Sequence, residues 1–174
     1  MPPSTPQSSA SGCPLCDRGK AIDAKDPAAL VDHIATFTHC HAILSENQGT
    51  LAGRGPNSPS GSGGWVVLVL RHHAASHPEH LADLPIETQA EIFAEVARVA
   101  HAIRTVFGPV RINYECLGNV VPHIHWHVIP RDPTDPSDPD PRKPVWGWSE
   151  AQLKGTLTPA QRLALRDRLR AALR

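Results

Sequence analysis

Apolar runs separated by polar segments predict a set of strands. Residues 65–70, Trp-Val-Val-Leu-Val-Leu, are apolar throughout and rich in β-branched side chains, which is typical of a central strand. Residues 34–44 predict one or two short strands. Residues 110–116 and 121–129 predict two more, joined by a turn at Leu117-Gly118-Asn119.

Helical periodicity appears in three places. From about Ile86 to Phe107 apolar residues recur at steps of three and four, which predicts one long amphipathic helix that ends at Gly108-Pro109. A short helix after Ser149 and a terminal one from Pro159 to about Leu173 are each preceded by the capping-box spacing. This order of elements predicts an α+β domain with a mainly antiparallel sheet of about five strands.

The same pattern divides the chain. Residues 1–12 are rich in proline and serine and predict a disordered tail. Residues 13–148 form the predicted domain, with residues 49–64 as a Gly/Ser/Pro loop insertion, and residues 132–144 also predict a loop. Residues 149–174 form a C-terminal helical extension.

Charge and hydropathy limit the partners. The 17 basic and 17 acidic residues balance, so the field that attracts a nucleic acid or a membrane surface is not expected. The N-terminus lacks the pattern of a signal peptide, and no run of about 18 apolar residues follows. We therefore expect a cytoplasmic protein that does not bind nucleic acid or membranes.

The four cysteines fall into two groups. Cys13 and Cys16 form a Cys-Pro-Leu-Cys motif, which in a reducing compartment indicates a metal clip or a redox pair more than a structural disulfide. Cys40 and Cys116 are interpreted as small buried apolar groups.

A row of three histidines carries the candidate chemistry. In a strand His123, His125 and His127 share one face, while Ile124, Trp126 and Val128 share the other and can be buried. The histidines would lie roughly 6.5 to 7 Å apart, which suits groups spread along a polyphosphate better than ligands that converge on one ion. A neutral imidazole can attack phosphorus and later leave when water attacks.

Two other interpretations of this row stay open. The histidines could form an ordinary solvated or hydrogen-bonded strand face without chemistry. They could also bind metal in a hydrolase or cupin-like site, but no carboxylate accompanies them on the strand, and Asp132 lies beyond Pro130.

The segment Pro122-His-Ile-His-Trp-His-Val-Ile-Pro-Arg131 resembles the signature of the histidine-triad (HIT) family, in particular of a bacterial subgroup. The resemblance extends upstream through residues 111–113 and 117–122 and downstream to residues 143–146, so that it covers most of the chain from Cys13 to Trp148. It implies a HIT-like fold.

The resemblance also implies roles for the histidines. His125 corresponds to the family's nucleophile, which forms a nucleotidyl-histidine intermediate that water releases. His127 corresponds to the histidine that contacts phosphate oxygens. His123 corresponds to the one that orients the nucleophile or, in metal-containing branches, binds zinc.

Three further residues are candidates for substrate binding by the same resemblance. Gly118 and Asn119 stand where many members have Gly-Gln, so Asn119 is expected to contact a phosphate or the leaving group. Asn113 matches an asparagine that lies near the ribose and phosphates, although an ordinary strand-end asparagine is the alternative.

The resemblance leaves a zinc site open. Cys13, Cys16 and His123 match three ligands of a structural zinc found in some members, but Gly64-Trp65 stands where the fourth, a histidine, is usual. His72 or His73 could substitute, whereas the later His77 and His80 are expected to be surface groups. No cofactor is expected to be required for the reaction.

The sequence therefore predicts a nucleotide hydrolase or nucleotidyl transferase that attacks an α-phosphate of a dinucleoside polyphosphate or nucleoside phosphoramidate. The resemblance also implies that the chain forms a homodimer. Trp146 and Trp148 are expected either to cover the pocket or to pack on the sheet edge. The alternatives are a non-catalytic nucleotide-binding or interaction protein and a zinc-dependent hydrolase.

Overall fold

The computed structural model describes residues 12–48, 63–71, 77–108, 111–131, 142–154 and 157–174. A five-stranded sheet lies at its centre, with the strand order β1-β2-β3-β5-β4 and antiparallel pairing throughout. The strands are β1 (His33–Thr36), β2 (Cys40–Leu44), β3 (Val66–Leu70), β4 (Arg111–Glu115) and β5 (His125–Arg131). The α+β prediction is confirmed.

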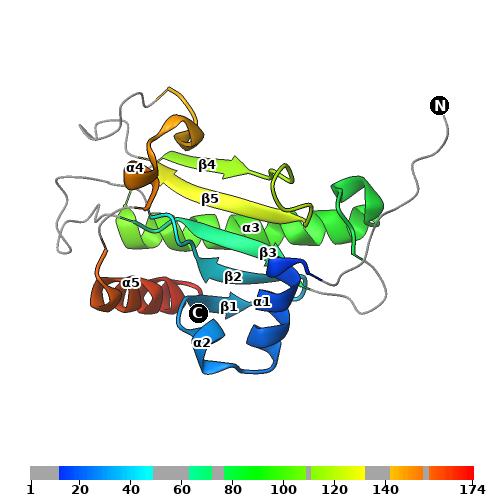
Figure 1. The fold of residues 1–174 in the computed structure, drawn as a ribbon, viewed down its shortest axis with the longest axis horizontal. Coiled ribbons are helices and arrows are strands. Elements are labelled where there is room, and N and C mark those ends of the chain that lie inside the picture. The colour runs from blue at the N-terminus through cyan, green and yellow to red at the C-terminus, as the bar shows by residue number, and fades with distance from the viewer. Residues whose placement is uncertain (1–11, 49–62, 72–76, 109–110, 132–141, 155–156) are drawn as a thin grey trace.

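Five α-helices and two 3-10 turns surround the sheet (Figure 1). They are α1 (Pro14–Asp23), α2 (Pro27–Leu30), η1 (Leu81–Asp83), α3 (Ile86–Phe107), η2 (Val145–Gly147), α4 (Glu150–Lys154) and α5 (Pro159–Ala172). The long helix α3 runs across one face of the sheet, and its predicted bounds are confirmed. Among the described residues, no helix has the length and apolar character needed to cross a membrane.

Alternation along the strands divides the core between the two faces of the sheet. Val66, Leu68 and Leu70 of β3 pack under α3 and α5. The intervening Val67 and Val69 belong to a second cluster with α1, α2 and η2. The central strand is therefore buried on both faces, as its nearly all-apolar sequence predicts.

The terminal helix α5 is attached by apolar and polar contacts. Leu165 and Leu169 are buried in the α3 side of the core. Arg166, Arg168 and Arg170 donate hydrogen bonds to the main-chain carbonyls of residues 31, 106 and 33, at 2.8, 3.0 and 2.6 Å. These three arginines thus attach α5 to backbone atoms outside the helix.

Several element predictions require correction. The histidine strand begins at His125 and not at residue 121, because residues 117–124 take an irregular path before the ladder with β3 starts. Helices α1 and α2 were not predicted; α1 is mostly polar and buries only Cys16, Gly19 and Ile22. The predicted tail and most of the two predicted loops lie outside the described residues.

Candidate active site

The register between β3 and β5 sets the histidines on one face of the sheet. His125 pairs with Val69 and His127 with Val67, so both side chains point to the face opposite α3. Ile124, Trp126 and Val128 are buried in the core on the α3 side. The predicted alternation is confirmed for His125 and His127, whereas His123, predicted on the same strand, lies before it.

His125 is held in a defined orientation by its own chain. Its Nδ1 lies 2.6 Å from the carbonyl oxygen of His123. A carbonyl can only accept, so Nδ1 carries the proton and Nε2 of the neutral ring keeps a free electron pair. The side chain is 9% exposed and lines a cavity, so the arrangement presents an oriented nucleophile.

His127 lies among aromatic rings. The indole Nε1–H of Trp65 donates to its Nδ1 at 3.1 Å, and the rings of Trp65, Trp146 and His125 lie 5.5, 5.1 and 5.1 Å from its own. Burial, and then the charge of His125, lower the pKa of His127 to about 4. His127 is therefore a neutral imidazole near pH 7.

His123 turns away from the other two histidines. Its Nδ1 lies 3.6 Å from Cys13 Sγ, 3.4 Å from Cys16 Sγ and 3.3 Å from His77 Nε2. The four ligand atoms lie within 4.8 Å of one another. On its other side, His123 Nε2 donates to the carbonyl oxygen of Leu70 at 2.9 Å, which leaves Nδ1 as the atom for a metal.

The two cysteines of this group are reduced in the structure. Cys13 caps the N-terminus of α1, and its sulfur accepts from the backbone N–H of Cys16. Burial and the neighbouring Cys13 raise the pKa of the Cys16 thiol to about 11. The Cys16 thiol therefore keeps its proton near pH 7 unless a cation displaces it.

A cavity of about 490 Å³ opens beside His125 and His127. It is a size that suits a small organic ligand. The described residues that line it combine these histidines with two amides and several apolar groups: Asn47, Leu117, Asn119, Val120, Val121 and Trp146. The lining offers hydrogen bonds and an aromatic surface but no carboxylate.

Only some of the predicted binding residues lie at the cavity. Asn119 lines the cavity, and Gly118 precedes it. Asn113 lies within β4, opposite Ile129, and is not among the described residues of the lining. Trp146 lines the cavity and donates to the carboxylate of Glu115, so the tryptophan covers the site of its own chain.

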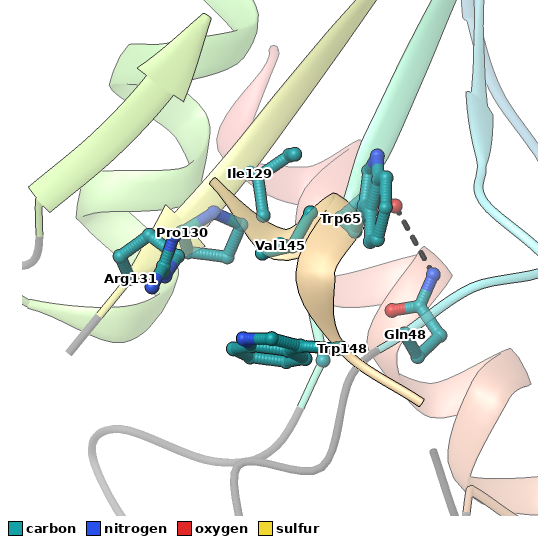
Figure 2. Close-up of a pocket in the computed structure, with 8 residues that line it drawn as sticks. Gln48, Trp65, Ile129, Pro130, Arg131, Val145 and Trp148 are labelled. Carbon is teal, nitrogen blue, oxygen red and sulfur yellow. Dashed lines mark hydrogen bonds between the residues drawn. The ribbon is translucent and has the colours of Figure 1, made fainter. Parts of the chain in front are cut away.

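A second cavity, near the other end of β5, is too small for a ligand. It measures about 10 Å³ and lies between β5, η2 and Gln48 (Figure 2). Trp148 lies under Arg131 there, with the guanidinium 5.3 Å from the ring centre, and is 9% exposed. This space is a packing gap of about one water molecule, and Trp148 packs on the sheet.

Sequence reasoning missed His77, Trp65 and Asn47, whereas Trp146 was one of the two tryptophans considered as a cover for the pocket. His77 was expected to be a surface group, but it completes the four-residue group. His72 and His73, the proposed substitutes, lie outside the described residues. A histidine following the central strand, together with the Cys-x-x-Cys motif, was the available signal.

Comparisons with known proteins agree with this geometry. A family model described as the HIT domain matches residues 59–134. No curated protein matches the chain.

Solved structures share the fold. A histidine-triad protein from Bradyrhizobium japonicum is 21% identical, with 84% of this chain and 95% of that chain covered at a TM-score of 0.60. One from Marinobacter aquaeolei is 25% identical, covering 82% and 89% at 0.59. A Zn-bound histidine-triad family protein from Mycobacterium smegmatis is 22% identical, covering 91% and 92% at 0.54.

Proposed function

We propose that this chain, whose residues 59–134 match the HIT domain and whose fold is that of histidine-triad proteins, is a nucleotide hydrolase or nucleotidyl transferase. Its substrate is a dinucleoside polyphosphate or a nucleoside phosphoramidate, attacked at the α-phosphate. One observation carries the proposal: His125 donates its Nδ1–H to the His123 carbonyl and lines the large cavity, so that Nε2 is the atom of the neutral ring that can attack.

In the first step Nε2 of His125 attacks the α-phosphorus. A P–N bond forms, the bond from phosphorus to the leaving group breaks, and the leaving group departs with the electron pair. The positive charge that develops on His125 is stabilised because its Nδ1–H points at a carbonyl oxygen. His127 donates its Nε2–H to a phosphoryl oxygen.

In the second step water attacks the same phosphorus. The P–N bond breaks, its electron pair returns to Nε2 of His125, and the proton of the water leaves to solvent. Asn119 and the backbone at Gly118 contact the phosphates or leaving group from the cavity wall. Asn113 would contact the ribose only if the bound substrate extends beyond the cavity.

The test is hydrolysis of diadenosine polyphosphates, an adenosine phosphoramidate and their guanosine equivalents. Wild type should turn over at least one of them, and His125→Ala should reduce kcat by about 10³-fold or more, as expected when a covalent nucleophile is removed. The matched control is His101→Ala, an exposed histidine of α3, which should keep full activity. Turnover that persists in His125→Ala would rule the mechanism out.

Two alternatives predict different results. A non-catalytic nucleotide-binding protein would bind these compounds without forming a phosphohistidine, which acid-quenched labelling of the chain would reveal. A zinc-dependent hydrolase would need a metal with an open coordination position. The four-residue group already supplies four ligands and includes only His123 of the triad, which favours the nucleophile over metal catalysis.

We also propose that Cys13, Cys16, His77 and His123 hold a structural zinc ion. In a tetrahedral site with Zn–N of about 2.0 Å and Zn–S of about 2.3 Å, N and S ligands lie about 3.5 Å apart and two N ligands about 3.3 Å apart. The observed separations are 3.4 and 3.6 Å to sulfur and 3.3 Å between the nitrogens. Elemental analysis should find one zinc per chain, and His77→Ala should lower that ratio while His101→Ala should not.

The chain is further proposed to form a homodimer through β4. This strand is at the edge of the sheet, and Tyr114 on it is 52% exposed, so a second copy could extend the ladder. Light scattering should give twice the 18.8 kDa chain mass; a monomer at micromolar concentration would argue against it. Cytoplasmic location stays a prediction.

A further inference from the structure

We propose that Trp65 fixes His127 as a neutral hydrogen-bond donor, and that the site therefore cleaves phosphoanhydrides in preference to phosphoramidates. The inference rests on the proposed function and selects between its two substrate classes. Its starting point is the single hydrogen bond from Trp65 Nε1 to His127 Nδ1, at 3.1 Å.

The bond determines the tautomer of His127. An indole N–H can only donate, so the Nδ1 that receives it must lack a proton, and the neutral ring carries its proton on Nε2. Protonation would add the ring's second proton, at Nδ1, and break this hydrogen bond. Trp65 thus opposes the charged form of His127 and leaves Nε2–H as the group that can act on a substrate.

Trp65 itself is firmly held. Its side chain is 2% exposed, and its carbonyl accepts from the backbone N–H of Ser45 at 2.9 Å and from Gln48 Nε2 at 3.1 Å (Figure 2). The preceding Gly64 has φ +95°, and an added Cβ would lie 2.3 Å from the Phe107 ring. A backbone fixed on both sides leaves the indole little freedom to turn away from His127.

The tautomer matters because the two substrate classes differ in their leaving group. When a P–O–P bond breaks, the leaving phosphate oxygen keeps the electron pair as an anion that is stable near pH 7, since a terminal phosphate has its second pKa near 6. When a P–N bond breaks, the nitrogen needs a proton to leave as an amine. His127 could supply it from Nε2 only by becoming an imidazolate anion.

No other described residue that lines the cavity can donate a proton to the leaving nitrogen in place of His127. Asn47 and Asn119 do not titrate, and His125 is the nucleophile. A carboxylate on the same sheet face belongs to Glu115, which pairs with His127 across β4 and β5 and accepts from the Trp146 indole. It is therefore engaged as an acceptor.

The first experiment records the imidazole ¹⁵N–¹H correlations of His127 in the full-length protein at pH 7. Wild type should show a neutral ring protonated on Nε2. Trp65→Phe, which removes the N–H donor and keeps a smaller aromatic ring, should give a mixture of tautomers or a charged ring. Trp148→Phe is the matched control, because that side chain packs under Arg131 and does not line the cavity beside His127, and it should leave the tautomer unchanged.

The second experiment compares kcat/KM for diadenosine tetraphosphate and adenosine 5′-phosphoramidate. The anhydride-to-phosphoramidate ratio should fall in Trp65→Phe by roughly 10²-fold, the lower end of what one proton-transferring side chain contributes. Trp148→Phe, outside the cavity, should keep the wild-type ratio. A wild-type preference for the phosphoramidate, or an unchanged ratio in Trp65→Phe, would overturn the inference.

The two proposals fail in distinguishable ways. Turnover that survives in His125→Ala removes the proposed function, whatever the tautomer of His127. Turnover that requires His125, with wild-type His127 protonated on Nδ1, removes only the further inference. If Trp65→Phe does not fold, the wild-type spectrum still decides the tautomer.

Discussion

The histidines of this protein show how one residue type acquires different roles from its surroundings. His123 offers Nδ1 to a group of metal ligands, whereas His125 uses Nδ1 to donate to a carbonyl. Away from the site, His41 is fully buried and contacts the hydroxyl of Thr36 at 3.0 Å, and the same hydroxyl lies 3.0 Å from His33. The partner of each nitrogen decides what the ring can do.

The half-buried His33 and the buried His41 predict acid sensitivity. Burial, then the charges of His41 and Arg170, lower the pKa of His33 to about 4, and burial also lowers that of His41. The unfolded chain therefore binds more protons between about pH 6.5 and 4, so stability falls as the pH drops through that window. Urea unfolding at pH 7, 6 and 5 should show this loss, with a shallower slope for His33→Asn. Identical slopes for the variant and wild type would contradict the assignment.

At the scale of elements, α5 matters because it closes one side of the core. Its N-terminus carries the predicted capping box, in which Thr158 accepts from the N–H of Gln161 and the Gln161 side chain accepts from Thr158. Leu165 and Leu169 extend the α3 layer beside β1. The helix is therefore part of the folded domain, although its composition is mostly polar.

Truncation of one side chain tests this attachment. Leu169→Ala should lower the free energy of unfolding by about 2 to 5 kcal/mol, because it leaves a cavity where the side chain is 1% exposed. Leu163 lies on the same helix and is 41% exposed, so Leu163→Ala should cost less than about 0.5 kcal/mol. Equal losses in urea titrations would show that α5 is not packed as described.

At the scale of the whole molecule, the proposed metal site joins segments far apart in the chain. Cys13 and Cys16 come from α1, His77 from the segment before η1, and His123 from the entrance to β5. The backbone of His123 also orients His125. The N-terminal helix and the nucleophile are thus linked through one residue.

Removal of zinc should therefore destabilise the fold. A bound metal adds about 2.7 kcal/mol when its free concentration is 100 times Kd, so a strong chelator should lower Tm. Cys16→Ser should begin at the lower Tm and respond little to the chelator, whereas Cys116→Ser, an exposed cysteine outside the group, should respond as wild type does. A wild-type Tm that is indifferent to both chelator and added zinc would refute the structural role.

Much of the fold follows from local patterns, while the site depends on register and tertiary approach. The period of two placed His125 and His127 on one face, and the period of 3.6 predicted α3, because both are properties of a single segment. The contact of Trp65 with His127 depends on how β3 aligns with β5. The approach of His77 to the cysteines depends on the whole domain, so no local pattern predicted it.

The arginines of α5 also bear on how the protein responds to ionic strength. Ion pairs between exposed side chains weaken in salt, since the Debye length is about 8 Å at 0.15 M and about 3 Å at 1 M. Arg162 of α5 forms an ion pair with Asp32, but Arg166, Arg168 and Arg170 donate to main-chain carbonyls, which are neutral dipoles at contact distance. A helix whose sequence suggests electrostatic attachment should therefore stay docked from dilute buffer to molar salt.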